Sequence, residues 1–227
     1  MNAAPRFRVV VVGGHTRSIG KTQLVCDIIS AFPEANWVAG KITQFGHGVC
    51  AQNGENCDCA PSEHSAAVDW ERHAETGTDS ARFLAAGARR SLWLRTKQGY
   101  LAEGLPLLRA ALQEAGNGSG DAPLNLILES NSLLKFLKPA LFLVVVAPEK
   151  TDFKESARLV LDRADAVVLR EAPGPSGPGT SGPAWSGVPV QLLHAKPCFV
   201  QREGELLPEG VRNLVTALLR DADGQRI

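Results

Sequence analysis

Short apolar runs alternate along the chain with longer segments in which apolar residues recur every three or four positions. The runs predict strands, and the periodic segments predict amphipathic helices. The predicted strands cover residues 6–12, 37–42, 91–95, 124–128, 141–146, 166–169 and 189–193. The predicted helices cover residues 22–31, 79–88, 101–115, 152–163 and 208–220. Because strands alternate with helices, we expect an α/β fold of three layers, with a mostly parallel sheet between helices.

Two polar stretches interrupt this alternation. Residues 43–65 carry glycine, cysteine and histidine, and predict a long loop inserted into the domain. Residues 172–189, "APGPSGPGTSGPAWSGVP", are rich in proline and glycine and predict a flexible loop. We find no internal repeat, so we expect residues 1–227 to form a single domain with these two loops.

Composition narrows the class of protein. The 24 basic residues equal the 24 acidic ones, which gives no global reason to expect a nucleic-acid partner or an anionic membrane surface. The longest apolar run, residues 140–147, is far shorter than the ~20 residues of a membrane-spanning helix. The valine run near the N-terminus is too short for a signal peptide. We therefore expect a cytoplasmic protein.

The stretch "VVVVGGHTRSIGKTQL" predicts a phosphate-binding loop between the first strand and the first helix. Such a loop needs glycines that let backbone N–H groups face phosphate oxygens, a lysine for the β- and γ-phosphates, and a hydroxyl for Mg²⁺. The spacing is one residue longer than usual, so that His15 stands where a glycine is expected. The residues predicted to bind a nucleotide are Gly14, His15, Thr16, Arg17, Ser18, Ile19, Gly20, Lys21 and Thr22.

Two further residues complete the predicted catalytic set with Lys21. Glu129 follows an apolar strand, where a carboxylate can hold Mg²⁺ together with Thr22, directly or through water. Arg17 lies in the loop and is either a group that stabilises charge on a transferring phosphate or a solvated loop arginine.

A cluster of cysteine and histidine lies in the 43–65 loop. Thiolate and imidazole together suit Zn²⁺, and thiolates alone suit an iron–sulfur cluster. The spacing fits no standard zinc finger, and a polar loop with free thiols is the alternative. The preferred ligands are Cys50, Cys57, Cys59 and His64.

The phosphate loop together with "ETGTDSARFLAAGARR" resembles the B protein of molybdopterin-guanine dinucleotide biosynthesis (MobB). The resemblance covers roughly residues 6–130. It implies a small P-loop NTPase that binds GTP and assists a guanylyl-transfer step. The match to the family's second motif raises Asp79, Ser80 and Arg82 as candidate substrate residues, although Asp79 and Arg82 also have the spacing of a helix-surface ion pair.

The chain departs from that family in several places. Thr78 stands where the family has lysine, and Glu129 is followed by "SNS" rather than by glycine. The Cys/His loop is not a general feature of the family. No N-K-x-D guanine motif follows residues 166–169, which leaves ATP and GTP both open.

Three functions therefore remain at this point. The first is a MobB-like NTPase that uses ATP or GTP with Mg²⁺ and assists cofactor maturation or a partner protein. The second is a small-molecule kinase or ATP-dependent ligase on the same scaffold. The third is a metal-binding chaperone or redox module. A cofactor-biosynthesis protein is the expected partner, and a homodimer remains open.

Overall fold

The computed structural model describes residues 6–45, 64–116, 123–171, 193 and 195–220. Its helices and strands are β1 (Phe7–Gly14), α1 (Lys21–Ala31), η1 (Pro33–Ala35), β2 (Val38–Phe45), β3 (Ala66–Trp70), α2 (Asp79–Ala85), β4 (Arg90–Lys97), α3 (Leu101–Gly116), β5 (Leu124–Glu129), η2 (Ser132–Lys135), β6 (Leu141–Val146), α4 (Glu155–Arg158), η3 (Leu161–Arg163), β7 (Ala166–Glu171), β8 (Cys198–Arg202) and α6 (Glu209–Arg220). The cysteines of the predicted metal loop and most of the proline- and glycine-rich loop lie outside the described residues.

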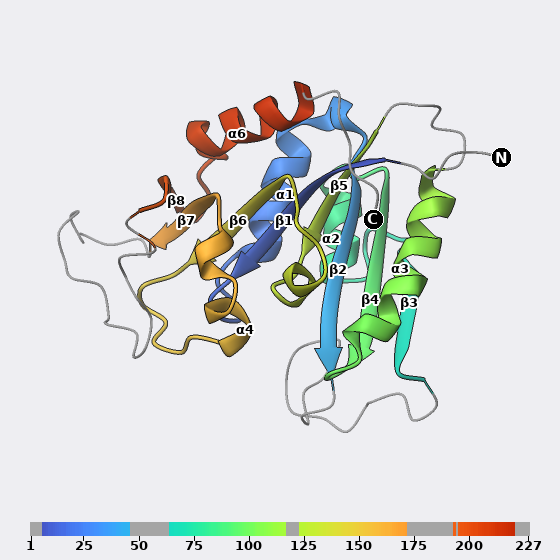
Figure 1. The fold of residues 1–227 in the computed structure, drawn as a ribbon. Coiled ribbons are helices and arrows are strands. Elements are labelled where there is room, and N and C mark those ends of the chain that lie inside the picture. The colour runs from blue at the N-terminus through green and yellow to red at the C-terminus, as the bar shows by residue number, and fades with distance from the viewer. Residues whose placement is uncertain (1–5, 46–63, 117–122, 172–192, 194, 221–227) are drawn as a thin grey trace.

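The strands form an eight-stranded sheet in the order β3-β4-β2-β5-β1-β6-β7-β8 (Figure 1). All neighbouring pairs are parallel except β3 and β4, which are antiparallel. β1 lies between β5 and β6, near the middle of the sheet, and is parallel to both. The loop that follows β1 therefore leaves the sheet at the edge where these strands have their carboxyl ends. Ligands of open α/β sheets bind beyond that edge.

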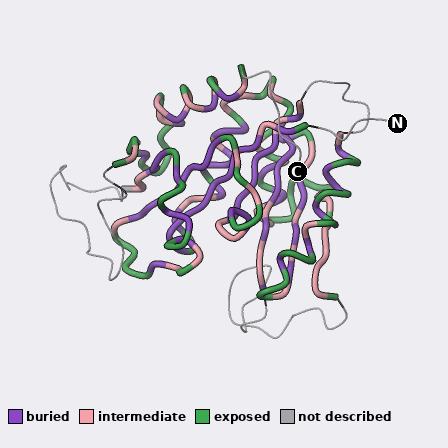
Figure 2. The backbone as a smooth tube through the Cα atoms, viewed as in Figure 1, coloured by how far each residue is buried: buried purple, intermediate pink, exposed green. Residues whose placement is uncertain are grey.

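Side chains of β1 alternate between two hydrophobic cores. Val9 and Val11 belong to the core under α3, η2, α4 and η3. Val10 and Val12 belong to the core under α1, α2 and α6. Figure 2 shows the buried strands running through the middle of the molecule. The sheet is therefore apolar on both faces, as a parallel sheet between two helical layers requires.

The predicted helix over residues 152–163 is wrong as a continuous helix. The structure has one α-helical turn in α4, followed by the short 3-10 turn η3. The helix begins later than predicted because Lys154, the residue before α4, has an extended backbone with φ −65° and ψ 139°. Its N–H donates a hydrogen bond to the His15 carbonyl oxygen, 2.8 Å away in the phosphate loop, which holds residue 154 outside the helix.

Two edge strands, β3 and β8, are absent from the prediction. β3 is partly exposed along most of its length, so it has no apolar run by which it could be recognised. Its position is fixed by antiparallel pairing with β4 and by the Arg90 guanidinium, which stacks 3.7 Å above the centre of the Trp70 ring. The predicted strand over residues 189–193 lies almost wholly outside the described residues. No helix in the described ranges is both long and apolar enough to span a bilayer.

Candidate functional site

Two left-handed backbone positions turn the loop between β1 and α1. Gly20, the residue before α1, has φ +83°, and Ser18 has φ +50°. Residues in this conformation turn successive N–H groups toward one side, which makes a concave anion site. The first N–H groups of α1 face the same region and carry the positive end of the helix dipole. The loop can therefore receive a phosphate group through backbone donors.

Lys21 lies across this concavity. Its Nζ donates to the Thr16 carbonyl oxygen at 2.5 Å, so the ammonium group spans the loop from its last residue toward its start. Burial lowers the pKa of Lys21, and the nearby Glu129 carboxylate acts in the opposite direction. An ammonium group that bonds a carbonyl oxygen of the loop itself is well placed to contact a phosphate oxygen bound there.

The carboxylate of Glu129 lies beside the first helix because β5 pairs with β1. Glu129 is in register with Val12 on β1 and with Lys41 on β2. The Thr22 hydroxyl donates to Glu129 Oε2 at 2.7 Å, and Glu129 is only 4% exposed. The structure thus brings together the two residues that the sequence names as the Mg²⁺ pair.

Lys41 is the residue of this region that sequence reasoning missed. Its Nζ lies 3.1 Å from Glu129 Oε1 and also forms an ion pair with Asp79. Although burial alone would lower it, the Glu129 and Asp79 carboxylates raise the pKa of Lys41. The sequence does contain a signal for Lys41. It is the one charged residue of the predicted strand 37–42, which is otherwise apolar, and a buried charge needs a partner. We call Thr22, Glu129, Lys41 and Asp79 the carboxylate network.

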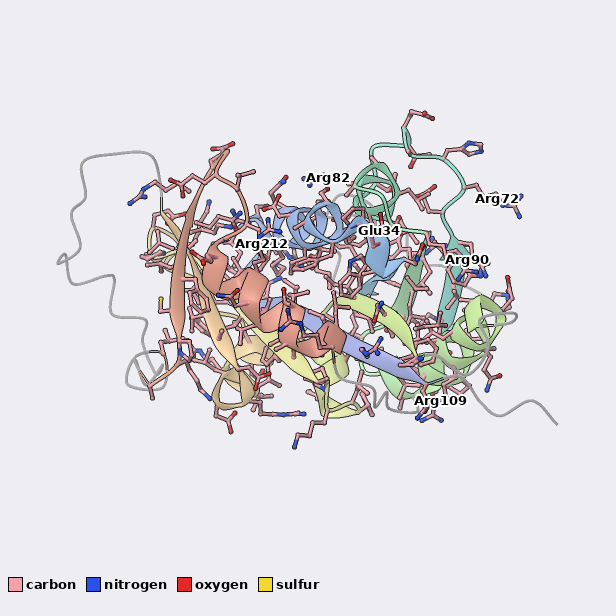
Figure 3. All side chains as sticks on the ribbon, turned by 90° about the horizontal axis from the view of Figure 1, so that it is seen from above. Glu34, Arg72, Arg82, Arg90, Arg109 and Arg212 are labelled. Atoms are coloured by element: carbon pink, nitrogen blue, oxygen red, sulfur yellow. The ribbon has the colours of Figure 1, made fainter. Side chains whose placement is uncertain are left out.

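Of the three candidate substrate residues, Asp79 and Arg82 form an ion pair, whereas Ser80 has other partners. Arg82 pairs with Asp79 at 3.8 Å and donates to Gln23 Oε1 at 2.7 Å, at the exposed side of α1 and α2 (Figure 3). Ser80 is buried and donates to Glu71 Oε2 at 3.1 Å instead. Asp79 therefore joins the carboxylate network, Arg82 borders it, and Ser80 stabilises the start of α2.

Asn131 explains why Gly13, near the end of β1, is a glycine. Its amide accepts from the Gly14 N–H at 2.9 Å and donates to the Gly14 carbonyl oxygen at 2.8 Å. A Cβ on Gly13 would overlap the same amide oxygen. The Asn131 amide thus occupies the space that a side chain at position 13 would need, and its two hydrogen bonds to Gly14 fix the point at which the loop leaves the sheet.

His15 and Thr16 are almost fully buried, whereas Arg17 and Ser18 are exposed. His15 and Thr16 contact the segment that follows β6 rather than solvent. Ile19 is also buried, and its side chain packs in the core under α1. Of the residues predicted to bind a nucleotide, only some therefore have side chains that a ligand can reach. The buried ones can act only through backbone groups.

The predicted metal site is not tested by this structure, because Cys50, Cys57 and Cys59 lie outside the described residues. His64 is exposed just before β3. Among the residues that the structure describes, no group of three or more His, Cys, Asp or Glu side chains has the arrangement of a metal site. Of the other cysteines, Cys26 is buried in the core and Cys198 is exposed on β8.

The structure confirms the predicted architecture, a three-layer α/β/α fold with a mostly parallel sheet. No protein-family model matches the chain. No curated protein matches it either. Among solved structures, HypB from Helicobacter pylori, in complex with nickel, matches over 92% of this chain and 85% of its own, with 15% identity and a TM-score of 0.49. That distant likeness supports no conclusion about ligand or activity.

Proposed function

We propose that this chain is a MobB-like P-loop NTPase that binds ATP or GTP together with Mg²⁺. The observation that carries the proposal is the 2.7 Å contact between the Thr22 hydroxyl and Glu129, two residues that lie 107 positions apart in sequence. A hydroxyl at the start of the first helix and a carboxylate at the end of a neighbouring strand are the groups that such a site needs.

The residues present fit Mg²⁺. Its preferred ligands are oxygens, and Thr22 Oγ1 and Glu129 Oε2 both lie at the carboxyl edge of the sheet beside the phosphate loop. When bound, the ion would neutralise charge on the phosphates. Thr22 Oγ1 and Glu129 would hold the ion, and Lys41 would remain paired with Asp79.

The protein's own part in hydrolysis follows from charge placement. Lys21 would contact the β- and γ-phosphates, and backbone N–H groups of residues 16–20 would surround them. The N–H groups of Gly14 and His15 already donate within the protein. Exposed Arg17 at the rim of the loop can reach a transferring phosphate, as the proposed catalytic arginine must. Glu129 would hold the metal or the attacking water. Turnover would support the maturation of a cofactor or the action of a partner protein.

Binding measured by isothermal titration calorimetry tests this proposal. The wild-type chain should bind Mg·ATP or Mg·GTP with one-to-one stoichiometry, and Lys21→Ala should weaken binding by about tenfold or more, because it removes a charge-assisted contact. Lys135→Ala is the control, since Lys135 is an exposed lysine on η2. Equal affinities for Lys21→Ala and wild type would contradict the proposed site.

A kinase or ligase is the second candidate, and one observation favours it. Lys41 and Asp79 form an ion pair directly beside Glu129, so an acceptor molecule bound there would lie next to the proposed metal. Asp79 and Arg82 are its candidate contacts. Turnover separates the two functions: a kinase needs its small-molecule acceptor, whereas a partner-driven NTPase responds to a protein.

A further inference from the structure

The lengthened phosphate loop makes a set of contacts that a phosphate site by itself does not require. His15 and Thr16 pack against the end of β6 and the residues that follow it, up to residue 154. The His15 N–H donates to the Val145 carbonyl oxygen at 3.2 Å, and His15 Nε2 lies 3.4 Å from the Lys150 carbonyl oxygen. The Thr16 hydroxyl donates to Asp152. We call residues 147–154 the docked segment.

Two more contacts complete the attachment of the docked segment. The Lys154 N–H donates to the His15 carbonyl oxygen at 2.8 Å, and the His15 ring lies 5.2 Å from the Phe153 ring. Burial lowers the pKa of His15, so the imidazole is neutral near pH 7 and suits this interior position. Residue 15, which occupies the place of the usual glycine, therefore joins the phosphate loop to the docked segment.

The docked segment ends at Lys154, whose ammonium is only partly exposed. Burial, followed by the charges of Lys21 and Arg17, lowers the pKa of Lys154 to about 8. The other charges that act on it are Asp152, which opposes the shift, and Lys41, which adds to it. A lysine on a short surface segment would ordinarily extend into water, where its charge is solvated. Here the fold keeps it near two other cations of the phosphate loop.

We propose that Lys154 is a third cation of the phosphate site, held against the loop by His15 and Thr16, and that it contacts the phosphate groups of the bound nucleotide. This inference rests on the proposed function. An anion at the loop would offset the repulsion that Lys21 and Arg17 exert on the Lys154 ammonium. The additional loop residue then has a definite role, because it positions a binding residue from outside the loop.

The inference is tested by Lys154→Met, which keeps the aliphatic stem and removes the charge, and by Lys154→Arg, which keeps the charge. We expect Lys154→Met to weaken Mg·ATP or Mg·GTP binding by about tenfold or more, and Lys154→Arg to retain most of the affinity. Without nucleotide, Lys154→Met should melt at a higher temperature than wild type, because the folded state disfavours the charged form of this group. A lysine that only fills space would give a lower melting temperature and unchanged affinity.

Proton uptake provides a readout specific to this charge. At pH 8 the Lys154 ammonium is about half deprotonated without ligand, and a bound phosphate should restore its proton. Calorimetry in buffers of different ionisation enthalpy should therefore show uptake of up to roughly half a proton in wild type, with less in Lys154→Arg, whose side chain stays charged. Equal uptake by both proteins would overturn the role of Lys154.

The outcomes separate this inference from the proposed function. If wild type binds, Lys21→Ala does not, and Lys154→Met binds as wild type does, then the phosphate site stands and the third cation is wrong. If wild type binds neither nucleotide, both are wrong. Thr16→Val tests the attachment: it removes the hydrogen bond to Asp152, and we expect an affinity between those of wild type and Lys154→Met.

Discussion

Replacing Lys41 with methionine tests the carboxylate network most sharply. The substitution keeps the length and apolar stem of the side chain, but it leaves Glu129 and Asp79 without their shared cation. The side chain of Glu129 is 5% exposed, that of Lys41 is 19% exposed and that of Asp79 is 35% exposed. Without Lys41, water can therefore solvate the negative charge of Asp79 in part, but it hardly reaches that of Glu129.

The expected loss of stability follows from that burial. Removing one partner of a buried ion pair costs ~3–5 kcal/mol, because the other charge stays buried without compensation. We expect the lower end, about 3 kcal/mol, since Thr22 still donates to Glu129 and water reaches Asp79. For a domain of this size, that loss lowers Tm by roughly 6–12 °C. Mg²⁺ at millimolar concentration should restore part of it in Lys41→Met, because the ion supplies a positive charge to Glu129.

Urea unfolding followed by circular dichroism, with and without Mg²⁺, measures this free energy of unfolding. Lys135→Met is the matched control and should remain within about 0.5 kcal/mol of wild type, as exposed substitutions do. A Lys41→Met protein as stable as that control would refute the network. In combination with Glu129→Gln, the two losses should be less than additive by about 1–3 kcal/mol, since both remove the same ion pair.

Three other predictions concern the loop and the cysteines. Gly20→Ala should destabilise the domain by more than about 1 kcal/mol in thermal unfolding, because Gly20 has φ +83° and a Cβ there would lie 2.9 Å from Arg170 Nε; an unchanged Tm would contradict this. Asn131→Ala should lower stability by about 1–3 kcal/mol in urea, since it removes both hydrogen bonds to Gly14; Asn213→Ala, at an exposed position of α6, is the control and should stay within about 0.5 kcal/mol of wild type. Purified protein should contain about one Zn, or roughly two to four Fe, per chain by elemental analysis if residues 43–65 bind a metal ion or an iron–sulfur cluster, and a Cys57→Ser, Cys59→Ser protein should lose it; metal-free wild type with no response to a chelator would rule the site out.

The fold class follows from sequence because its evidence is local. Apolar runs mark the strands that are buried on both faces, such as β1 and β6, and glycine with lysine and threonine marks the loop. The strand that carries Glu129 is recognised in the same way. That it lies beside β1 cannot be read from periodicity, because strand order depends on long-range pairing.

The parts that sequence did not reveal depend on contacts between distant segments. Lys41 is one charge in an apolar strand, and its function becomes visible only when Glu129 and Asp79 lie beside it. Lys154 appears as one position of a predicted helix until the His15 carbonyl oxygen is seen to accept its N–H. β3 lacks a continuous apolar run, since an edge strand can remain partly exposed.

The Mg²⁺ dependence of nucleotide affinity tests the central claim most directly. Wild-type protein and Thr22→Val are titrated with ATP and with GTP, in Mg²⁺ and in excess EDTA. If Thr22 and Glu129 form the metal site, wild type binds one nucleotide much more tightly with Mg²⁺ than without it, and Thr22→Val loses that difference while its EDTA affinity is retained. Binding of neither nucleotide by the wild type, or the same Mg²⁺ dependence in both proteins, would contradict the account.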